Sequence, residues 1–501
     1  MKNKLLYILF ATLIFGSSSC SKDFLDERPS DVISAEDLEN AVSQDPELLN
    51  GNIAGLYTTM FETETGGTTG HDDFGQKGYD LFMDLMVSDM ALLGINYGWY
   101  RDLSRYTSTV DFTQNNVYIP WRYYYRIIFA ANTVIDALGG TDAEIEDRLS
   151  RHIMGQAKAM RAYAYFYLAN LYSREGYGTG NEAILPIYNN TAVPNQPLSS
   201  SKEVYDLIVS DLNTAIEYLD DFSRTSKSQI DKSVAQGLLA YALAARAGQE
   251  DLKQVVEITN SIVQDEKYRL TTRAEVVAEL GANGELLNPE SGFNDVNTPS
   301  WMWGVDLTLE NGLNLVSWWG QVDMFTYSYA SVGDRKGIDK GLFDKIKDTD
   351  IRKKQFFQAD LTPRNKFFAP ARTIQGQRYI ETDYIYMRVD EMVLLNAEAN
   401  AKLGNEAAAI MSLKRLLNLR IDDTSYLDLL SGQALLDEIY LQTRIELWGE
   451  GKTYLAMKRN KKSVVRGSNH LSHAGKEFSY NAPELSMPIP QAEILNNPEI
   501  N

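Results

Sequence analysis

The sequence predicts a mainly α-helical protein, in which tetratricopeptide-like helical hairpins form a scaffold and a large loop-rich insert carries few short strands. Apolar residues recur at the 3.6-residue spacing of a helix face in two successive segments, 384–403 and 409–417. Gly404 separates these segments and suits the left-handed position that ends a helix, so the two helices must lie antiparallel as a hairpin. Residues 268–383 lack such stripes and are rich in Gly, Pro, Asn and aromatic residues, which predicts the insert.

The same periodicity predicts helices on both sides of the insert. Asp45 and Pro46 form a helix start, with an N-cap and a proline in the first turn, and that helix runs towards Phe61. A second hairpin is expected to turn at Gly248. The expected helices before the insert span 79–93, 121–138, 149–172, 202–219, 234–247 and 252–263, and one late helix spans 434–448. The Pro-rich tail, 481–501, is expected to be extended.

These patterns divide the chain into five parts. The expected parts are a signal peptide at 1–19, a lipidated tether at 20–34, an N-terminal helical region at 35–267, the loop-rich aromatic insert at 268–383, and a C-terminal helical region with its tail at 384–501.

The N-terminus predicts export and lipidation. Lys2 and Lys4 precede an apolar run, 5–15, which is too short to span a bilayer, and the small residues 16–19 lead to Cys20. This layout resembles a lipoprotein processing site, at which Cys20 would carry the acyl chains that hold the protein on a membrane. The alternative is an ordinary cleavage site with an incidental thiol. Cys20 is the only cysteine, so no disulfide can form within the chain.

The charge balance argues against binding to nucleic acid. The chain has 48 Lys and Arg against 68 Asp and Glu, which gives a formal net charge of −20. Binding to a phosphate backbone needs a basic face, so we expect no nucleic-acid partner. The simplest consequence of the acidic excess is solubility.

No common catalytic or metal-binding motif is present. The four histidines lack the spacing of a zinc site, and no G-x-S-x-G elbow occurs. Gly451-Lys452-Thr453 is not a P-loop, because Glu446 stands where the first glycine is required. We therefore expect no catalytic residue, no metal and no cofactor. A glycoside hydrolase is the alternative, because such an enzyme needs a pair of carboxylates and 68 acidic residues could supply many pairs.

Short motifs spread in order along the chain resemble those of one family. They are Trp121, Tyr124, Ile127 and Asn132; Gly155 to Lys158 with Arg161 and Ala162; Arg388, Glu391 and Ala397 to Ala399; Arg444, Glu446, Leu447, Glu450 and Gly451; and Met487 to Gln491 with Glu493, Asn497 and Pro498. In these positions the chain resembles the SusD/RagB family of outer-membrane nutrient-binding lipoproteins.

The resemblance implies a role as well as a fold. Such proteins sit on the surface of the outer membrane of Gram-negative cells, held by a lipid anchor, and capture a nutrient without cleaving it for a SusC-like TonB-dependent transporter. We therefore expect an oligosaccharide ligand and that transporter as partner. The alternatives are capture of peptides, as in some members of the family, and a periplasmic helical-repeat scaffold for protein partners.

Exposed aromatic residues are the expected ligand contacts. A sugar ring has an apolar face and a polar edge, so its site needs a flat aromatic ring beside amide, carboxylate or guanidinium groups. Two loop regions offer this mixture, and the resemblance points to the same regions. The candidate residues are Asn96, Tyr97, Trp99, Tyr100 and Arg101 in the first region, and Trp301, Trp303, Trp318, Trp319 and Tyr327 in the second. We expect one or two of the four tryptophans in the second region to be exposed.

Overall fold

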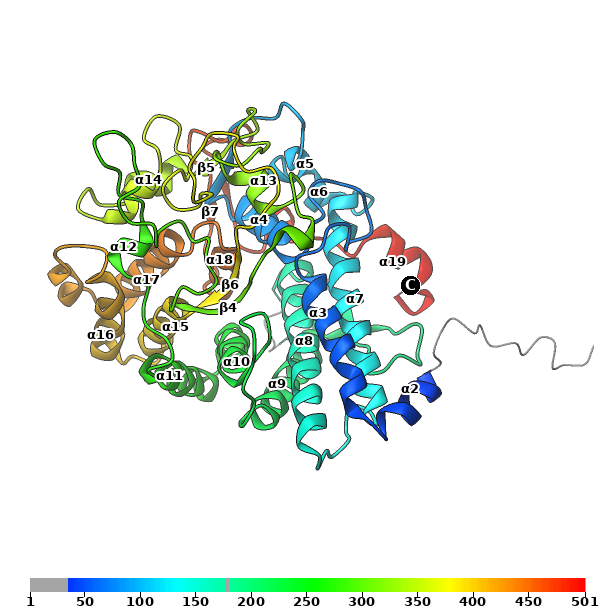
Figure 1. The fold of residues 1–501 in the computed structure, drawn as a ribbon. Coiled ribbons are helices and arrows are strands. Elements are labelled where there is room, and N and C mark those ends of the chain that lie inside the picture. The colour runs from blue at the N-terminus through cyan, green and yellow to red at the C-terminus, as the bar shows by residue number, and fades with distance from the viewer. Residues whose placement is uncertain (1–34, 176–179, 501) are drawn as a thin grey trace, which may run out of the picture.

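A curved stack of helices forms the scaffold of the protein. The computed structural model describes residues 35–175 and 180–500, so the expected signal peptide, Cys20 and tether lie outside the described residues. Each helix of the stack packs on the next, and together the helices confirm the predicted mainly α-helical class (Figure 1). The stacked helices are α7 (Asn115–Ala137), α8 (Arg148–Tyr172), α9 (Ser201–Tyr218), α10 (Lys232–Arg246), α11 (Gln249–Gln264), α15 (Val389–Lys402), α16 (Glu406–Leu417) and α17 (Gly432–Glu446).

The shorter elements lie before, between and after these helices. The helical ones are α2 (Ala35–Val42), η2 (Pro46–Leu49), α3 (Asn50–Thr59), α4 (Gln76–Met86), α5 (Arg101–Ser104), α6 (Thr107–Val110), α12 (Arg273–Val276), η3 (Leu309–Asn311), α13 (Trp318–Val322), α14 (Lys340–Lys345), η4 (Ile351–Gln355), η5 (Ser425–Leu429), α18 (Lys452–Arg459), η6 (Pro483–Leu485), α19 (Gln491–Asn496) and η7 (Pro498–Ile500). The strands are β1 (Met90–Leu92), β2 (Ala183–Pro186), β3 (Leu198–Ser200), β4 (Trp301–Val305), β5 (Lys336–Ile338), β6 (Tyr384–Arg388), β7 (Val464–Val465) and β8 (Glu477–Phe478), which form four two-stranded antiparallel sheets. Among the described residues, none of the helices combines the length and the apolar character needed to cross a bilayer.

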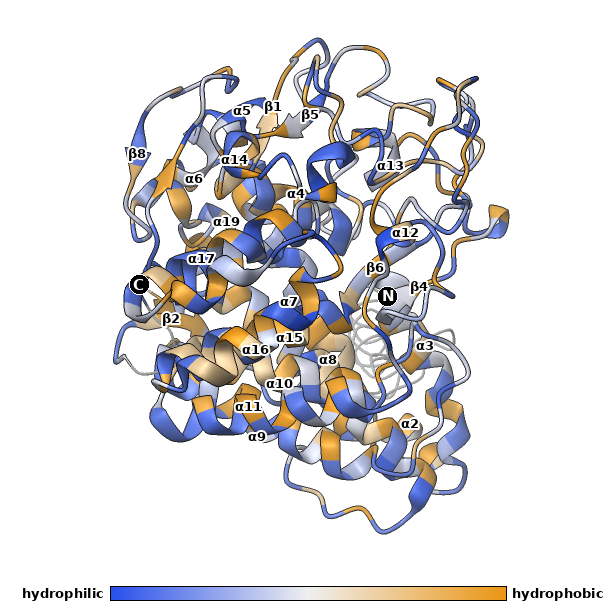
Figure 2. Cartoon of the chain, turned by 90° about the vertical axis from the view of Figure 1, so that its left-hand side faces the viewer, coloured by the Kyte–Doolittle hydropathy of each residue, from blue (hydrophilic) through white to orange (hydrophobic). Residues whose placement is uncertain are grey.

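The insert interrupts the stack in sequence but not in space. Helix α11 packs directly on α15, although residues 265–388 separate them in the chain. The intervening chain therefore leaves and rejoins the stack at neighbouring helices, and it lies over one side of it. Figure 2 shows a helical lower half and a loop-rich upper half that contains β5, α13 and α14.

The predicted hairpin of α15 and α16 is confirmed, with one correction at its start. Gly404 has a φ of +80°, the left-handed conformation expected after a helix end. The prediction that the first helix begins at Tyr384 is wrong. Residues Tyr384–Arg388 form strand β6, which pairs with β4 in the insert, and the helix begins at Val389. All five strand residues are buried, so their backbone groups need a partner that only a distant segment supplies.

Two further predicted elements are wrong for a similar reason. The helix expected at 79–93 ends as α4 at Met86, and its last residues form β1, which pairs with β5. The tail was expected to be extended, yet it contains the short helix α19. Partners far away in the sequence decide both conformations: Leu93 donates its backbone N–H to Arg335 at 2.7 Å, and Gln491 donates to Phe112 at 2.9 Å.

A buried network of charges fastens the insert to the scaffold. The carboxylate of Glu446, at the end of α17, accepts hydrogen bonds from Arg352 of η4 at 3.0 Å, from Arg388 of β6 at 2.9 Å and from Arg420 at 2.9 Å. Glu450 adds contacts to Arg388 and to Lys366 of the insert at 2.9 Å each. The three guanidinium groups hold the pKa of Glu446 well below its usual range. Four segments of the chain thus meet at one carboxylate.

Replacement of Glu446 by Gln should destabilise the fold strongly. Three buried guanidinium groups would then face a neutral amide, and breaking a buried charge pair from one side costs about 3–5 kcal/mol. Denaturant titration followed by circular dichroism measures the free energy of unfolding. As a matched control, Glu250→Gln removes a carboxylate from an exposed pair with Lys253 and should leave the stability near that of the wild type. Equal effects of the two substitutions would contradict the assigned role of the network.

Candidate functional site

Two loops from distant parts of the chain meet at the edge of the β1–β5 sheet. The carboxylate of Asp334 accepts the backbone N–H groups of Asn96 and of Tyr97, the latter at 2.9 Å. The loops approach so closely at Gly94 that a Cβ there would lie 1.9 Å from the carbonyl oxygen of Gly333. These contacts therefore hold the loop of residues 94–100 against the insert.

An aromatic cluster, which we call the Trp99 platform, consists of His71, Tyr97, Trp99 and Tyr329. The rings of Trp99 and His71 stack with centroids 5.0 Å apart and an interplanar angle of 8°. Tyr329 lies buried beside them, hydrogen-bonds through its hydroxyl to Nδ1 of His71 at 2.5 Å, and meets the ring of Tyr97 edge-on at 5.1 Å. Tyr97 is 61% exposed and Trp99 is half-buried. The platform thus offers ring surface that the interior fixes in place.

A polar pocket of about 370 Å³ adjoins Trp99. Its wall combines the indole with hydroxyl, amide, carboxylate and guanidinium groups. The lining residues are Thr68, Thr69, Gly70, Asp72, Gly98, Trp99, Tyr100, Arg101, Asp102, Gln114, Asn115, Asn116 and Ile119. A flat ring beside several fixed donors and acceptors suits a ligand with an apolar face and many hydroxyl groups.

The charged groups of this pocket are few and specifically placed. Burial raises the pKa of Asp72 to about 6, and the side-chain amide of Asn116 donates to its carboxylate at 2.8 Å. Arg101 pairs with its neighbour Asp102 at 3.1 Å, so the pocket holds no unopposed guanidinium group. Burial also lowers the pKa of His71, which favours a neutral imidazole in the stack with Trp99.

The structure brings together most of the first predicted group of site residues. Asn96, Tyr97 and Arg101 are exposed, and Trp99 and Arg101 line the pocket. Tyr100 reaches the pocket wall but is buried, with Phe82 edge-on at 5.6 Å and the ammonium of Lys336 at 5.0 Å from its ring. His71, Asp72 and Tyr329 complete the site from distant positions, and no local signal in the sequence separates them from other loop residues.

The expectation for the tryptophans of the second group is wrong. Trp301, Trp303, Trp318 and Trp319 are each at most 2% exposed. Trp301 and Trp303 belong to β4, which lies in the core and pairs with β6, and Trp303 donates its indole N–H to Ser228 at 2.8 Å. Trp318 and Trp319 pack against each other, and Trp318 also packs on Phe367. These four residues hold the insert on the scaffold and offer no ring face to a ligand.

Tyr327 differs from these tryptophans, because it is 38% exposed. Its backbone N–H donates to Gln377 at 2.8 Å, and the guanidinium of Arg378 lies 4.4 Å from its ring. Its role in binding stays a prediction. Within residues 35–175 and 180–500, no three His, Cys, Asp or Glu side chains lie close enough together to hold a metal ion.

The fold is that of a helical-repeat protein whose loops carry an aromatic cluster beside a polar pocket. Two family models match the chain: one described as "Starch-binding associating with outer membrane" over residues 23–247, and one described as "SusD family" over residues 345–501. The chain belongs to the SusD family.

Similar proteins cover nearly the whole chain. A SusD-like protein of Bacteroides ovatus is 22% identical over an alignment that covers 100% of this chain and 97% of the relative. A solved SusD-like carbohydrate binding protein from Bacteroides vulgatus superposes with a TM-score of 0.70 at 24% identity, covering 90% of this chain and 96% of that one. Surface glycan-binding protein A from Bacteroides uniformis gives 0.62 at 16% identity, covering 91% and 99%. At these identities the structures show the shared fold.

Proposed function

We propose that this protein captures oligosaccharides at the cell surface without cleaving them and delivers them to a TonB-dependent outer-membrane transporter. The observation that carries the proposal is the stack of Trp99 on His71 beside a pocket lined with amide, hydroxyl and carboxylate groups. Membership of the SusD family and the carbohydrate-binding names of structural neighbours support it. An accessible cluster of aromatic rings also argues against the alternative of a helical-repeat scaffold that binds only protein partners.

The geometry favours weak, reversible binding. If two rings each remove about 100 Å² of apolar surface from water, the gross gain is about 5 kcal/mol. Association costs several kcal/mol of that gain. The expected Kd is therefore on the order of tens of micromolar to millimolar. Weak binding suits a protein that must release its ligand to a transporter, and repeated sugar units raise the effective concentration.

The anchor and the partner belong to the same proposal. Cys20 would carry the lipid that holds the protein on the membrane. A SusC-like transporter would be the receiving partner, with contacts supplied by the rigid helical stack.

Replacement of Trp99 by Ala should weaken oligosaccharide binding about ten- to fiftyfold, because it removes the ring that a sugar face would cover. Affinity-gel electrophoresis or calorimetry, with a neutral ligand chosen by a glycan-array screen of the wild type, measures the loss. Phe357→Ala is the matched control, since Phe357 is an exposed aromatic residue outside the platform and the pocket. Unchanged affinity in the Trp99 variant would remove the basis of the proposed site, and a preference for peptides in the screen would favour the peptide-capturing alternative.

Incubation of the purified protein with the oligosaccharide that it binds should leave the sugar intact. The expected outcome is one unchanged chain length by chromatography and mass spectrometry after a long incubation. Shortened products would contradict non-catalytic binding and support the glycoside hydrolase alternative.

Affinity for a neutral oligosaccharide should fall by about three- to tenfold between pH 7.5 and pH 5, because hydrogen bonds to a charged acceptor are stronger than those to a neutral one. The pKa of Asp72 is about 6, so its carboxylate is ionised above that pH and becomes protonated below it. Calorimetry at several pH values measures the change. Asp72→Asn should bind at pH 7.5 about as the wild type does at pH 5 and should lose the pH dependence. If the Asp72→Asn variant keeps the pH dependence of its affinity, another group must titrate.

A further inference from the structure

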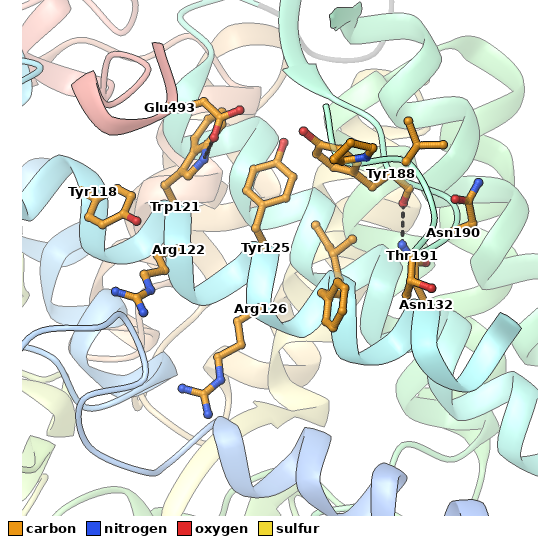
Figure 3. A pocket seen from close by; sticks show the side chains of 14 residues that line it. Tyr118, Trp121, Arg122, Tyr125, Arg126, Asn132, Tyr188, Asn190, Thr191 and Glu493 are labelled. Atoms are coloured by element: carbon orange, nitrogen blue, oxygen red, sulfur yellow. Dashed lines mark hydrogen bonds between the residues drawn. The ribbon is translucent and has the colours of Figure 1, made fainter. Parts of the chain in front are cut away.

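A second open groove lies on helix α7, apart from the pocket beside Trp99. Its volume is about 660 Å³, within the range of roughly 300–1,000 Å³ that is usual for ligand sites. One wall is a stripe of α7 residues at helical spacing, and the other is the loop between β2 and β3, with Glu493 of α19 at one end (Figure 3). The lining residues are Tyr118, Trp121, Arg122, Tyr125, Arg126, Ile128, Phe129, Asn132, Tyr188, Asn190, Thr191, Val193, Pro194 and Glu493.

Hydrogen bonds between the two walls hold the groove open in a fixed shape. The hydroxyl of Tyr125 donates to the carbonyl of Pro186 at 2.8 Å, and the amide of Asn132 donates to the carbonyl of Tyr188 at 2.9 Å. Thr191 donates its backbone N–H and its hydroxyl to Asp136 of α7, at 2.8 and 2.7 Å. A ligand would therefore meet a site that needs little ordering, which lowers the cost of binding.

The groove exposes apolar ring surface that the protein itself leaves uncovered. Phe129 of α7 is 61% exposed, and Val193 of the opposite loop is 40% exposed. Tyr125 is half-buried, with its ring edge-on to Tyr188 at a centroid distance of 5.8 Å. These rings can cover the apolar face of a sugar in the same way as the platform does.

Two guanidinium groups distinguish this groove from the pocket beside Trp99. Arg122 and Arg126 are exposed and four residues apart on α7, so they are neighbours on the same helix face, and Figure 3 shows both reaching outward along one edge. Arg126 forms no ion pair or hydrogen bond with any described residue, and Arg122 has only a long contact to the carbonyl of Gly67, at 3.5 Å. Like charges at this spacing repel each other, and an anion placed between them relieves the repulsion. In a chain with a net charge of −20, two adjacent arginines without a carboxylate partner are complementary to an anionic ligand.

We propose that this groove is a second saccharide site, which takes acidic sugars of the uronate class. The ring of the sugar lies on Phe129 and Tyr125, and its carboxylate is bound by Arg122 and Arg126. The proposal goes beyond the function proposed above and does not need the Trp99 platform, since the two sites share no lining residue.

The test compares trigalacturonate with its methyl ester, two probes that share their rings and differ in charge and in one methyl group on each carboxyl. Calorimetry on the full-length protein in detergent, at low salt, should show binding of the acid and at least about tenfold weaker binding of the ester. Affinity for the acid should fall as salt is added, because the guanidinium groups are exposed. The double variant Arg122→Gln/Arg126→Gln should lose at least about tenfold in affinity for trigalacturonate.

Matched variants separate this site from the other one. Arg273→Gln/Arg415→Gln makes the same change in net charge at exposed arginines outside the groove and should bind trigalacturonate as the wild type does. Phe129→Ala should weaken binding of the acid, whereas Trp99→Ala should not. Equal binding of acid and ester, no binding of either probe, full binding by the Arg122/Arg126 variant, or loss of binding in Trp99→Ala would each overturn the proposal. Failure of this site would leave the Trp99 result unaffected, because that result is measured with a neutral ligand.

Discussion

The carboxylate of Glu446 is the point on which the arrangement of the molecule depends. It joins η4 of the insert, strand β6, the chain after α16 and the end of α17 through three buried guanidinium groups. Removing so many charges from water is costly, and the cost is offset only when all partners are present in good geometry. The network therefore favours one placement of the insert over others. The segment that it fixes also contains β5 and Asp334, and the carboxylate of Asp334 accepts the backbone N–H groups of Asn96 and Tyr97 in the loop that carries Trp99.

The sequence predicted the helices well because their signal is local. A 3.6-residue apolar repeat and a glycine at position 404 are sufficient to define α15 and α16. Strands β1 and β6 were not predicted, because each is only three to five residues long and pairs with a segment far away in the chain. The motifs around Arg388 and Glu446 were part of the family resemblance, and in the structure their side chains form the buried network.

The sequence predicted the region of the candidate site but not which residues of that region are exposed. Trp99 and Trp303 are both surrounded by glycine and other loop residues in the sequence, yet one lies at the surface and the other in the core. Exposure depends on which face of a strand or loop meets the rest of the fold, and that information is absent from local composition. Helix α7 illustrates the point: Asn115, Asn116 and Ile119 line the pocket beside Trp99, whereas Tyr118, Arg122 and Arg126 line the second groove.

The direct packing of α11 on α15 allows the inserted chain to differ among related proteins while the helical stack stays the same. Because the two ends of the inserted chain are fastened to adjacent helices, its outer loops can lengthen, shorten or change composition without altering the register of the stack. The parts that must be preserved are the buried ones: the β4 tryptophans, Arg352 and Lys366. Exchange of that outer surface between homologues would then change the side of the platform that Tyr329 supplies, whereas the pocket residues, which all lie within 68–119, and the helical stack stay constant.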